Sequence, residues 1–272
     1  MFERSSCEFV ATATPMRRAG HATVGWLAVL LASTAGCGVL PGPLSPTHSS
    51  GSARTQLIHL PGMAGDSLAD RWWMNELRLG GAADRVELYD WTCNDTQIGA
   101  LQAYKRNHRE AQKIARRITD SRASSPETRI LLTATSAGTG PLIWSLENLP
   151  EGVTVDHVVL VAPAVSPDYD LSRALRHVCG KMYVFYSEGD WFVLGWGTST
   201  FGTVDGKKCQ AAGRFGFVPP QSSDATEYNK LVQLPYNSAW MKYFNFGDHT
   251  GAMSPSFARH FLAPMLVRDE QP

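Results

Sequence analysis

Ser136 is the residue whose type and position point most directly to chemistry. It lies in Ala134-Thr135-Ser136-Ala137-Gly138, directly after the apolar run 129–135, which has the composition of a buried strand. A strand, a small-x-Ser-x-Gly turn and a helix together form a nucleophile elbow, which exposes a serine hydroxyl on a sharp, strained turn. Small residues two positions before and after the serine avoid clashes with the adjoining strand and helix. The alternative is an ordinary strand-to-helix turn in which Ser136 caps the helix.

The elements that must position Ser136 alternate between strand and helix. Strands are predicted at 56–60, 85–91, 129–135, 156–162, 181–186 and 230–234, and helices at 66–79, 98–121, 137–149, 171–178 and 256–267. This alternation predicts an α/β fold with a mostly parallel central sheet and helices on both faces. Ligands of such folds bind at the carboxyl ends of the strands. The many Lys and Arg residues of 98–121 are interpreted as a solvated helix face.

The motif around Ser136, in this order of elements, resembles the α/β-hydrolase fold family over roughly residues 56–272. Ala134 stands where that family usually has Gly. The resemblance implies a serine hydrolase of the esterase or lipase type, with a triad in the chain order Ser, acid, His. A nucleophilic serine needs such a base and an orienting carboxylate.

The resemblance assigns the base to His249. This residue lies in Asn245-Phe-Gly-Asp-His-Thr-Gly251, a loop between the last predicted strand and the last predicted helix. His260 also follows the last strand, but it lies inside the predicted terminal helix, where a structural role is expected.

The acid is assigned to Asp190, because the family places its acid in the loop after the strand that corresponds to 181–186. Asp168 and Asp170 follow the preceding strand and remain alternatives. Asp205 is a third candidate, although its position before Gly206 is typical of a turn.

Two backbone N–H groups must stabilise the oxyanion of such a reaction. The resemblance places one at Ala137, after the nucleophile. It places the other at Met63, in the sequence His59-Leu-Pro-Gly-Met-Ala-Gly65. A simple Pro-Gly turn is the alternative, and His59 is expected to brace this loop.

An insertion separates Asp190 from His249. It is rich in aromatic residues and glycines, among them Trp191, Phe192, Trp196, Phe215 and Phe217. A lid or acyl pocket beside the active site is one interpretation, and a packed surface loop is the other.

The first 54 residues predict export and attachment rather than folded structure. Arg17 and Arg18 precede the apolar run 24–32, and small residues lead to Cys37, as in a bacterial lipoprotein signal. Residues 1–36 are therefore interpreted as a signal segment, with Met16 as a possible true start. Cys37 is the predicted lipidation site, 37–54 a flexible tether and 55–272 the α/β-hydrolase domain. A plain secretory signal is the alternative.

The composition argues against a nucleic-acid-binding protein, an ordinary membrane span and a zinc site. The chain of 272 residues has 25 Lys and Arg against 25 Asp and Glu, so it lacks the basic excess of a nucleic-acid-binding protein. Its longest apolar run is too short for an ordinary membrane span. No zinc-type cysteine spacing occurs. A disulfide between Cys179 and Cys209, with Cys93 buried, is one expectation, and three unpaired cysteines is the alternative.

These features together predict a membrane-tethered or secreted serine hydrolase of the bacterial cell envelope or periplasm. It would act on a small-molecule or lipid-like acyl substrate and require no cofactor or metal. The competing interpretation is a non-catalytic binding lipoprotein on the same scaffold.

Overall fold

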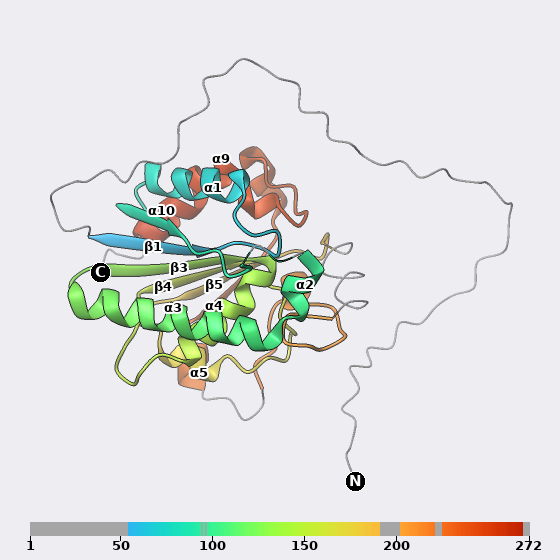
Figure 1. Ribbon diagram of the computed structural model, residues 1–272. Coiled ribbons are helices and arrows are strands. Elements are labelled where there is room, and N and C mark those ends of the chain that lie inside the picture. The colour runs from blue at the N-terminus through green and yellow to red at the C-terminus, as the bar shows by residue number, and fades with distance from the viewer. Residues whose placement is uncertain (1–53, 94, 96, 191–201, 221–224, 269–272) are drawn as a thin grey trace, which may run out of the picture. The chain divides into compact units, whose positions relative to one another are not determined.

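Six parallel strands form one sheet at the centre of the computed structural model, which describes residues 54–93, 95, 97–190, 202–220 and 225–268 (Figure 1). The strand order is β2-β1-β3-β4-β5-β6. The strands are β1 (Thr55–Leu60), β2 (Arg85–Leu88), β3 (Arg129–Thr135), β4 (His157–Val161), β5 (Met182–Tyr186) and β6 (Leu231–Pro235). Because all six are parallel, their carboxyl ends meet at one edge of the sheet.

Burial follows the apolar pattern of the strands. β1 and β4 are buried at every position and β3 at all but its first residue, whereas the edge strands β2 and β6 are partly exposed. The central strands are therefore covered on both faces, as expected for a parallel sheet.

Helices pack on both faces of this sheet (Figure 1). One face is covered by α3 (Tyr104–Ser124), α4 (Thr139–Glu147) and α5 (Ser172–Arg176), whose apolar side chains join one hydrophobic cluster. The other face is covered by α1 (Leu68–Leu79), α9 (Pro255–Phe257) and α10 (Ala263–Arg268), which belong to a second cluster. The predicted α/β fold class, with a parallel central sheet between two helical layers, is confirmed.

The remaining described elements are short. They are α2 (Gln97–Gln102), α7 (Ala212–Phe215), α8 (Ala225–Tyr228) and four segments of other helical type, η1 (Ser136–Gly138), η3 (Ser238–Tyr243), η4 (Gly251–Met253) and η5 (Ala258–Leu262). No helix within the described ranges is both long and apolar enough to cross a membrane.

The predicted helix 98–121 is two helices, and the reason is local. The side-chain amide of the buried Asn107 donates to the backbone carbonyl of Ala100 at 2.8 Å. This carbonyl therefore has a side-chain donor and does not depend on a backbone N–H of the next helical turn. Ala103 then adopts a non-helical ψ of 49° between α2 and α3. The predicted terminal helix is likewise interrupted, by the π-helical turn η5 between α9 and α10.

On α1, Trp73 and Leu77 are buried and Trp72 is 62% exposed. Two expectations about the cysteines were wrong. Cys93 is exposed rather than buried. Cys179 is not joined to Cys209 by a disulfide, and its thiol donates to the hydroxyl of Thr154.

Candidate active site

Ser136 occupies a strained turn at the carboxyl end of β3. Its φ is 49°, a left-handed backbone conformation that non-glycine residues adopt rarely and that often accompanies function. A Cβ built on Gly138 would lie 2.3 Å from the carbonyl oxygen of Pro61, which is too close for any other residue. The buried Ala134 lies on the strand side of the same turn. Gly138 is thus required by the close approach of the end of β1 and the loop that follows it.

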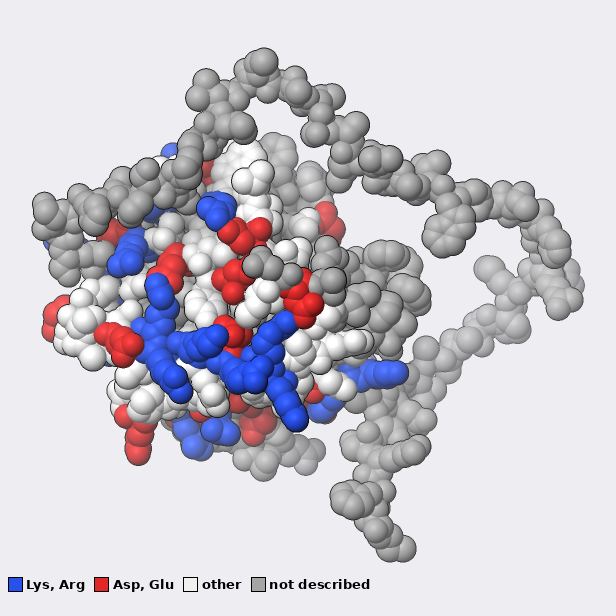
Figure 2. Space-filling view, in the orientation of Figure 1, with Lys and Arg blue, Asp and Glu red and all other residues white. Residues whose placement is uncertain are grey.

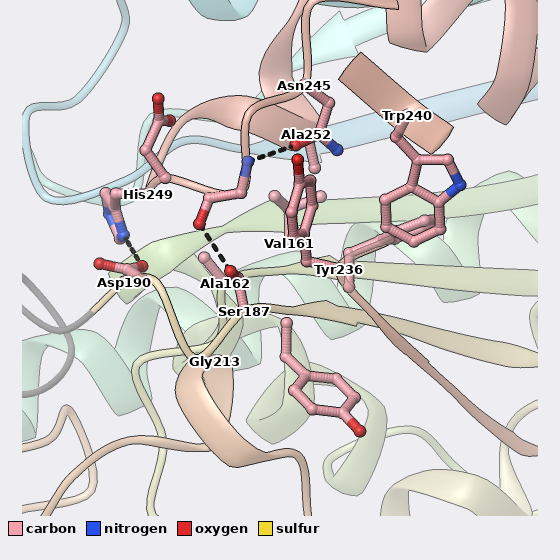
Figure 3. Close-up of a pocket in the computed structure, with 14 residues that line it drawn as sticks. Val161, Ala162, Ser187, Asp190, Gly213, Tyr236, Trp240, Asn245, His249 and Ala252 are labelled. Atoms are coloured by element: carbon pink, nitrogen blue, oxygen red, sulfur yellow. Dashed lines mark hydrogen bonds and ion pairs between the residues drawn. The ribbon is translucent and has the colours of Figure 1, made fainter. Parts of the chain in front are cut away.

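The structure brings Ser136, His249 and Asp190 together. His249 Nε2 lies 3.1 Å from Ser136 Oγ, and His249 Nδ1 lies 2.5 Å from Asp190 Oδ2. The His249–Asp190 contact is drawn in Figure 3. Three loops at the carboxyl edge of the sheet supply these residues, after β3, β5 and β6. The imidazole therefore bridges a hydroxyl and a carboxylate, one on each ring nitrogen.

Burial differs along this chain of contacts. The Asp190 side chain is 2% exposed and the His249 side chain 23% exposed. A carboxylate so deeply buried needs a charged or hydrogen-bonding partner, which His249 provides.

The other candidate carboxylates are engaged elsewhere. Asp168 forms an ion pair with Lys207 at 2.7 Å, and although burial acts against it, this lysine lowers the pKa of Asp168. A hydrogen bond from Ser172 lowers the pKa of Asp170. Asp205 accepts from the backbone N–H of Ser166 at 2.9 Å. None of these three contacts involves His249.

Ser187 joins the acid-bearing loop to the base-bearing loop. Its hydroxyl donates to the carbonyl of Gly247 at 2.6 Å and accepts from the N–H of Gly189 at 3.2 Å. The buried Asn245 accepts from the N–H of Gly247 at 3.0 Å, so the same short stretch is held from two sides (Figure 3). Sequence reasoning missed both residues, because a serine and an asparagine in loops carry no recognisable motif.

The loop predicted to stabilise the oxyanion lies beside the nucleophile. A Cβ built on Gly62 would be 3.5 Å from Ser136 Cβ, an ordinary van der Waals distance. The Gly62 carbonyl accepts from the N–H of Gly65 at 3.1 Å, and the Gly62–Met63 peptide bond is trans. In a trans peptide the C=O and N–H point in opposite directions, so the Met63 N–H is directed away from this turn.

Trp91 holds that loop directly, whereas His59, expected to brace it, contacts β3 and α1 instead. The indole of Trp91 donates to the carbonyl of Pro61 at 2.7 Å. His59, fully buried, contacts Thr133 Oγ1 at 2.9 Å and Asp70 Oδ1 at 3.0 Å through its two ring nitrogens. His59 therefore links β1 to β3 and to α1 and lies inside the protein core. Trp91 was missed because nothing near position 91 in the sequence indicates which carbonyl it binds.

The described part of the insertion packs tightly beside the site. Val204, Ala212 and Gly213 each donate a backbone hydrogen bond to the segment 163–165 that follows β4. A Cβ on Gly140 of α4 would lie 2.4 Å from Val204 Cγ1. Residues 202–218 thus include a packed loop, while 191–201, where a lid was considered, lie outside the described residues, as does Cys37.

A small pocket lies behind His249 and Asp190 (Figure 3). Its walls are largely apolar and include Ala162, Phe185 and Trp240. Within the described ranges, no group of three or more His, Cys, Asp or Glu side chains is placed to hold a metal ion. The arrangement present is the one suited to proton transfer between a hydroxyl and an imidazole.

Comparison with known proteins returns distant structural similarity only. No protein-family model matches the chain, and no curated protein matches it in sequence. Lipase B of Aspergillus fumigatus is 16% identical with a TM-score of 0.46, covering 79% of this chain, and the chain spans about half (53%) of that lipase. A cutinase-like protein of Cryptococcus is 13% identical with a TM-score of 0.40, covering 78% of this chain and 95% of the other. An esterase of Pyrococcus furiosus is 11% identical with a TM-score of 0.44, covering 79% and 83%.

Proposed function

We propose that this protein is a serine hydrolase that cleaves an ester or similar acyl bond through an acyl-enzyme. One observation carries the proposal: a strained, elbow-type Ser136 lies 3.1 Å from His249, which in turn lies 2.5 Å from the buried Asp190. A structural serine does not need this conformation, and a buried Asp-His pair aimed at a hydroxyl is the arrangement that activates a nucleophile.

In the proposed reaction, Ser136 Oγ attacks the carbonyl carbon while His249 Nε2 takes the hydroxyl proton. Asp190 holds the imidazolium through Nδ1. Collapse of the tetrahedral intermediate expels the leaving group, which receives the proton from His249. Water then attacks the acyl-enzyme with the same base, and Ser136 is regenerated. Every proton in this sequence passes through His249, and no step uses a metal or organic cofactor.

The oxyanion would be stabilised by the backbone N–H groups of Ala137 and Met63. Ala137 directly follows the nucleophile at the start of the helical segment that leads into α4, where N–H groups and the helix dipole favour negative charge. Support for Met63 comes from the proximity of Gly62 to Ser136 and from the peptide orientation set by the Gly62–Gly65 turn.

We further propose that the chain is exported and anchored in the bacterial cell envelope by lipidation of Cys37. This rests on the sequence pattern of residues 16–37 alone.

The substrate would be a small-molecule or lipid-like acyl compound. Ester, thioester and amide hydrolysis and acyl transfer share the same triad, so the reaction class is proposed as acyl hydrolysis in the broad sense.

A fluorophosphonate probe tests this proposal, since it labels only an activated serine. The wild-type protein should be labelled and should hydrolyse p-nitrophenyl esters, and Ser136→Ala should lose both properties. Ser124→Ala, which changes an exposed serine at the end of α3, is the matched control and should behave as wild type. A folded wild-type protein that takes no label and cleaves no ester in a series of acyl chain lengths would favour the non-catalytic binding protein.

A further inference from the structure

A basic groove lies at the amino edge of the sheet, the edge opposite the triad. Its walls are the carboxyl-terminal half of α3 and the first residues of β1 and β2. The cations are Arg85, Lys113, Arg116 and Arg117, and Gln56 and Ser121 add polar groups. Figure 2 shows Lys and Arg side chains gathered in a band over α3, which crosses the front of the molecule in Figure 1.

Two of the four cations are already paired and two are not. Arg117 forms an ion pair with Glu87 at 2.5 Å, and Lys113 forms one with Glu110 at 2.7 Å. Arg85 and Arg116 are exposed and form no ion pair with any residue that the structure describes. Asp120 is the one acidic residue that lines the groove, so the lining carries an excess of positive charge although the whole chain is neutral.

The described part of the chain begins at this groove. The backbone carbonyl of Arg54 accepts from the N–H of Arg129 at 2.8 Å, and the N–H of Thr55 donates to Asp84 at 2.9 Å. Gln56, which lines the groove, pairs in register with Arg85. Arg54, the first described residue and the point through which the predicted lipidation site Cys37 is joined to the domain, therefore lies near these cations.

The predicted tether is short on the scale of the domain. For the Gly-, Ser- and Pro-containing stretch 38–54, the r.m.s. span of a flexible chain is about 20–25 Å. A domain attached through so short a segment presents the face from which the segment leaves. That face carries unpaired arginines, which complement the negative surface of a bilayer that contains anionic lipids.

We infer that this groove docks the domain on an anionic bilayer surface, through the phosphate groups of the lipids. The surface would hold the triad about 17–20 Å from the bilayer, because strands of mostly five to six residues separate the two edges of the sheet. Substrate would then reach Ser136 from the aqueous side. This orientation rests on the proposed hydrolase site, whereas the binding itself does not.

The test is a vesicle sedimentation assay on the full chain carrying Cys37→Ser, which removes any lipid anchor. Vesicles of phosphatidylcholine are compared with vesicles that contain about one-third phosphatidylglycerol, and the ratio of the two partition coefficients is the readout. Adding Arg85→Gln and Arg116→Gln should lower this ratio about 25-fold, since each basic residue near such a surface contributes about fivefold. Should this double variant not fold, Arg116→Gln alone should lower it about fivefold.

The charge-matched control carries Lys208→Gln and Lys242→Gln instead. Lys208 lies in the insertion that packs beside the triad and Lys242 in η3, so both lie away from the groove. This control should keep the wild-type ratio. An unchanged ratio in the groove variant, a loss confined to the control variant, or displacement of the bound protein by millimolar inorganic phosphate would each overturn the inference. Because no arm measures hydrolysis, a catalytically inactive chain would not affect the result.

Discussion

Asp190 differs from the other carboxylates near the site in what its oxygens contact. It is buried and reaches His249 Nδ1, whereas Asp168 reaches Lys207 and Asp170 reaches Ser172. All three follow strands that end at the same edge of the sheet. The imidazole therefore selects one acid by loop geometry rather than by residue type or strand position.

Replacing Asp190 with Asn should remove most of the activity. The amide keeps the shape of the carboxylate but favours the wrong imidazole tautomer and cannot stabilise the imidazolium, so kcat should fall on the order of 10⁴-fold. Asp168→Asn and Asp170→Asn should each retain more than about a tenth of wild-type kcat. The kcat of each variant is measured by steady-state ester hydrolysis, and circular dichroism checks that the variant folds. An inactive Asp168→Asn beside an active Asp190→Asn would move the acid to the loop after β4.

At the scale of elements, the acid loop and the base loop act as one unit because Ser187 connects them. The loop after β5 carries Ser187 and Asp190, and the loop before η4 carries Gly247 and His249. A single hydroxyl bonds to both loops, at Gly247 and at Gly189. The distance from Asp190 to His249 thus depends on a contact between residues 60 positions apart.

Ser187→Ala should loosen this connection and lower kcat about fivefold with little change in KM, since one lost hydrogen bond corresponds to roughly 1 kcal/mol. Ser187→Thr keeps a hydroxyl and should recover much of the rate. Ser172→Ala also removes a serine hydroxyl bonded to its own loop, at Asp170, and serves as the control. If Ser187 had only a structural role, Ser187→Ala would have a lower melting temperature than wild type, but its kcat would stay within twofold of the kcat of Ser172→Ala.

The sheet has two edges, and each carries one of the proposed sites. The carboxyl edge of the sheet holds Ser136, Asp190 and His249, and the amino edge holds the start of the described chain and the basic groove. Parallel strands make this polarity unavoidable, because every βα turn lies at one edge and every αβ turn at the other.

Cys37→Ser should release the protein from the membrane fraction of the cells that produce it. Loss of the acyl chains removes the stable part of the attachment, and the groove alone provides only salt-sensitive binding. Fractionation with a high-salt wash distinguishes attachment by acyl chains from binding through the groove. The wild-type chain should stay with the membrane, and Cys37→Ser should be washed off. Failure of wild type to incorporate radiolabelled palmitate would contradict the lipoprotein proposal.

The order of elements, the fold class and the turn at Ser136 follow from the amino-acid sequence. These depend on short-range physics: apolar runs form buried strands, and a serine flanked at two positions by small residues suits a strained turn between a strand and a helix. Boundaries were less predictable where one side chain intervened, as Asn107 does between α2 and α3.

Tertiary packing sets which carboxylate meets His249, which side chains hold the site and where the basic face of α3 lies. The contacts of Trp91 with Pro61, of Ser187 with Gly247 and of His249 with Ser136 span 30, 60 and 113 positions. Local patterns carry no information about such pairs, because loop paths across the edge of the sheet result from the packing of the whole domain. The charged face of α3 was interpretable from sequence only as solvated, since its position beside the start of β1 exists only once the strands have paired.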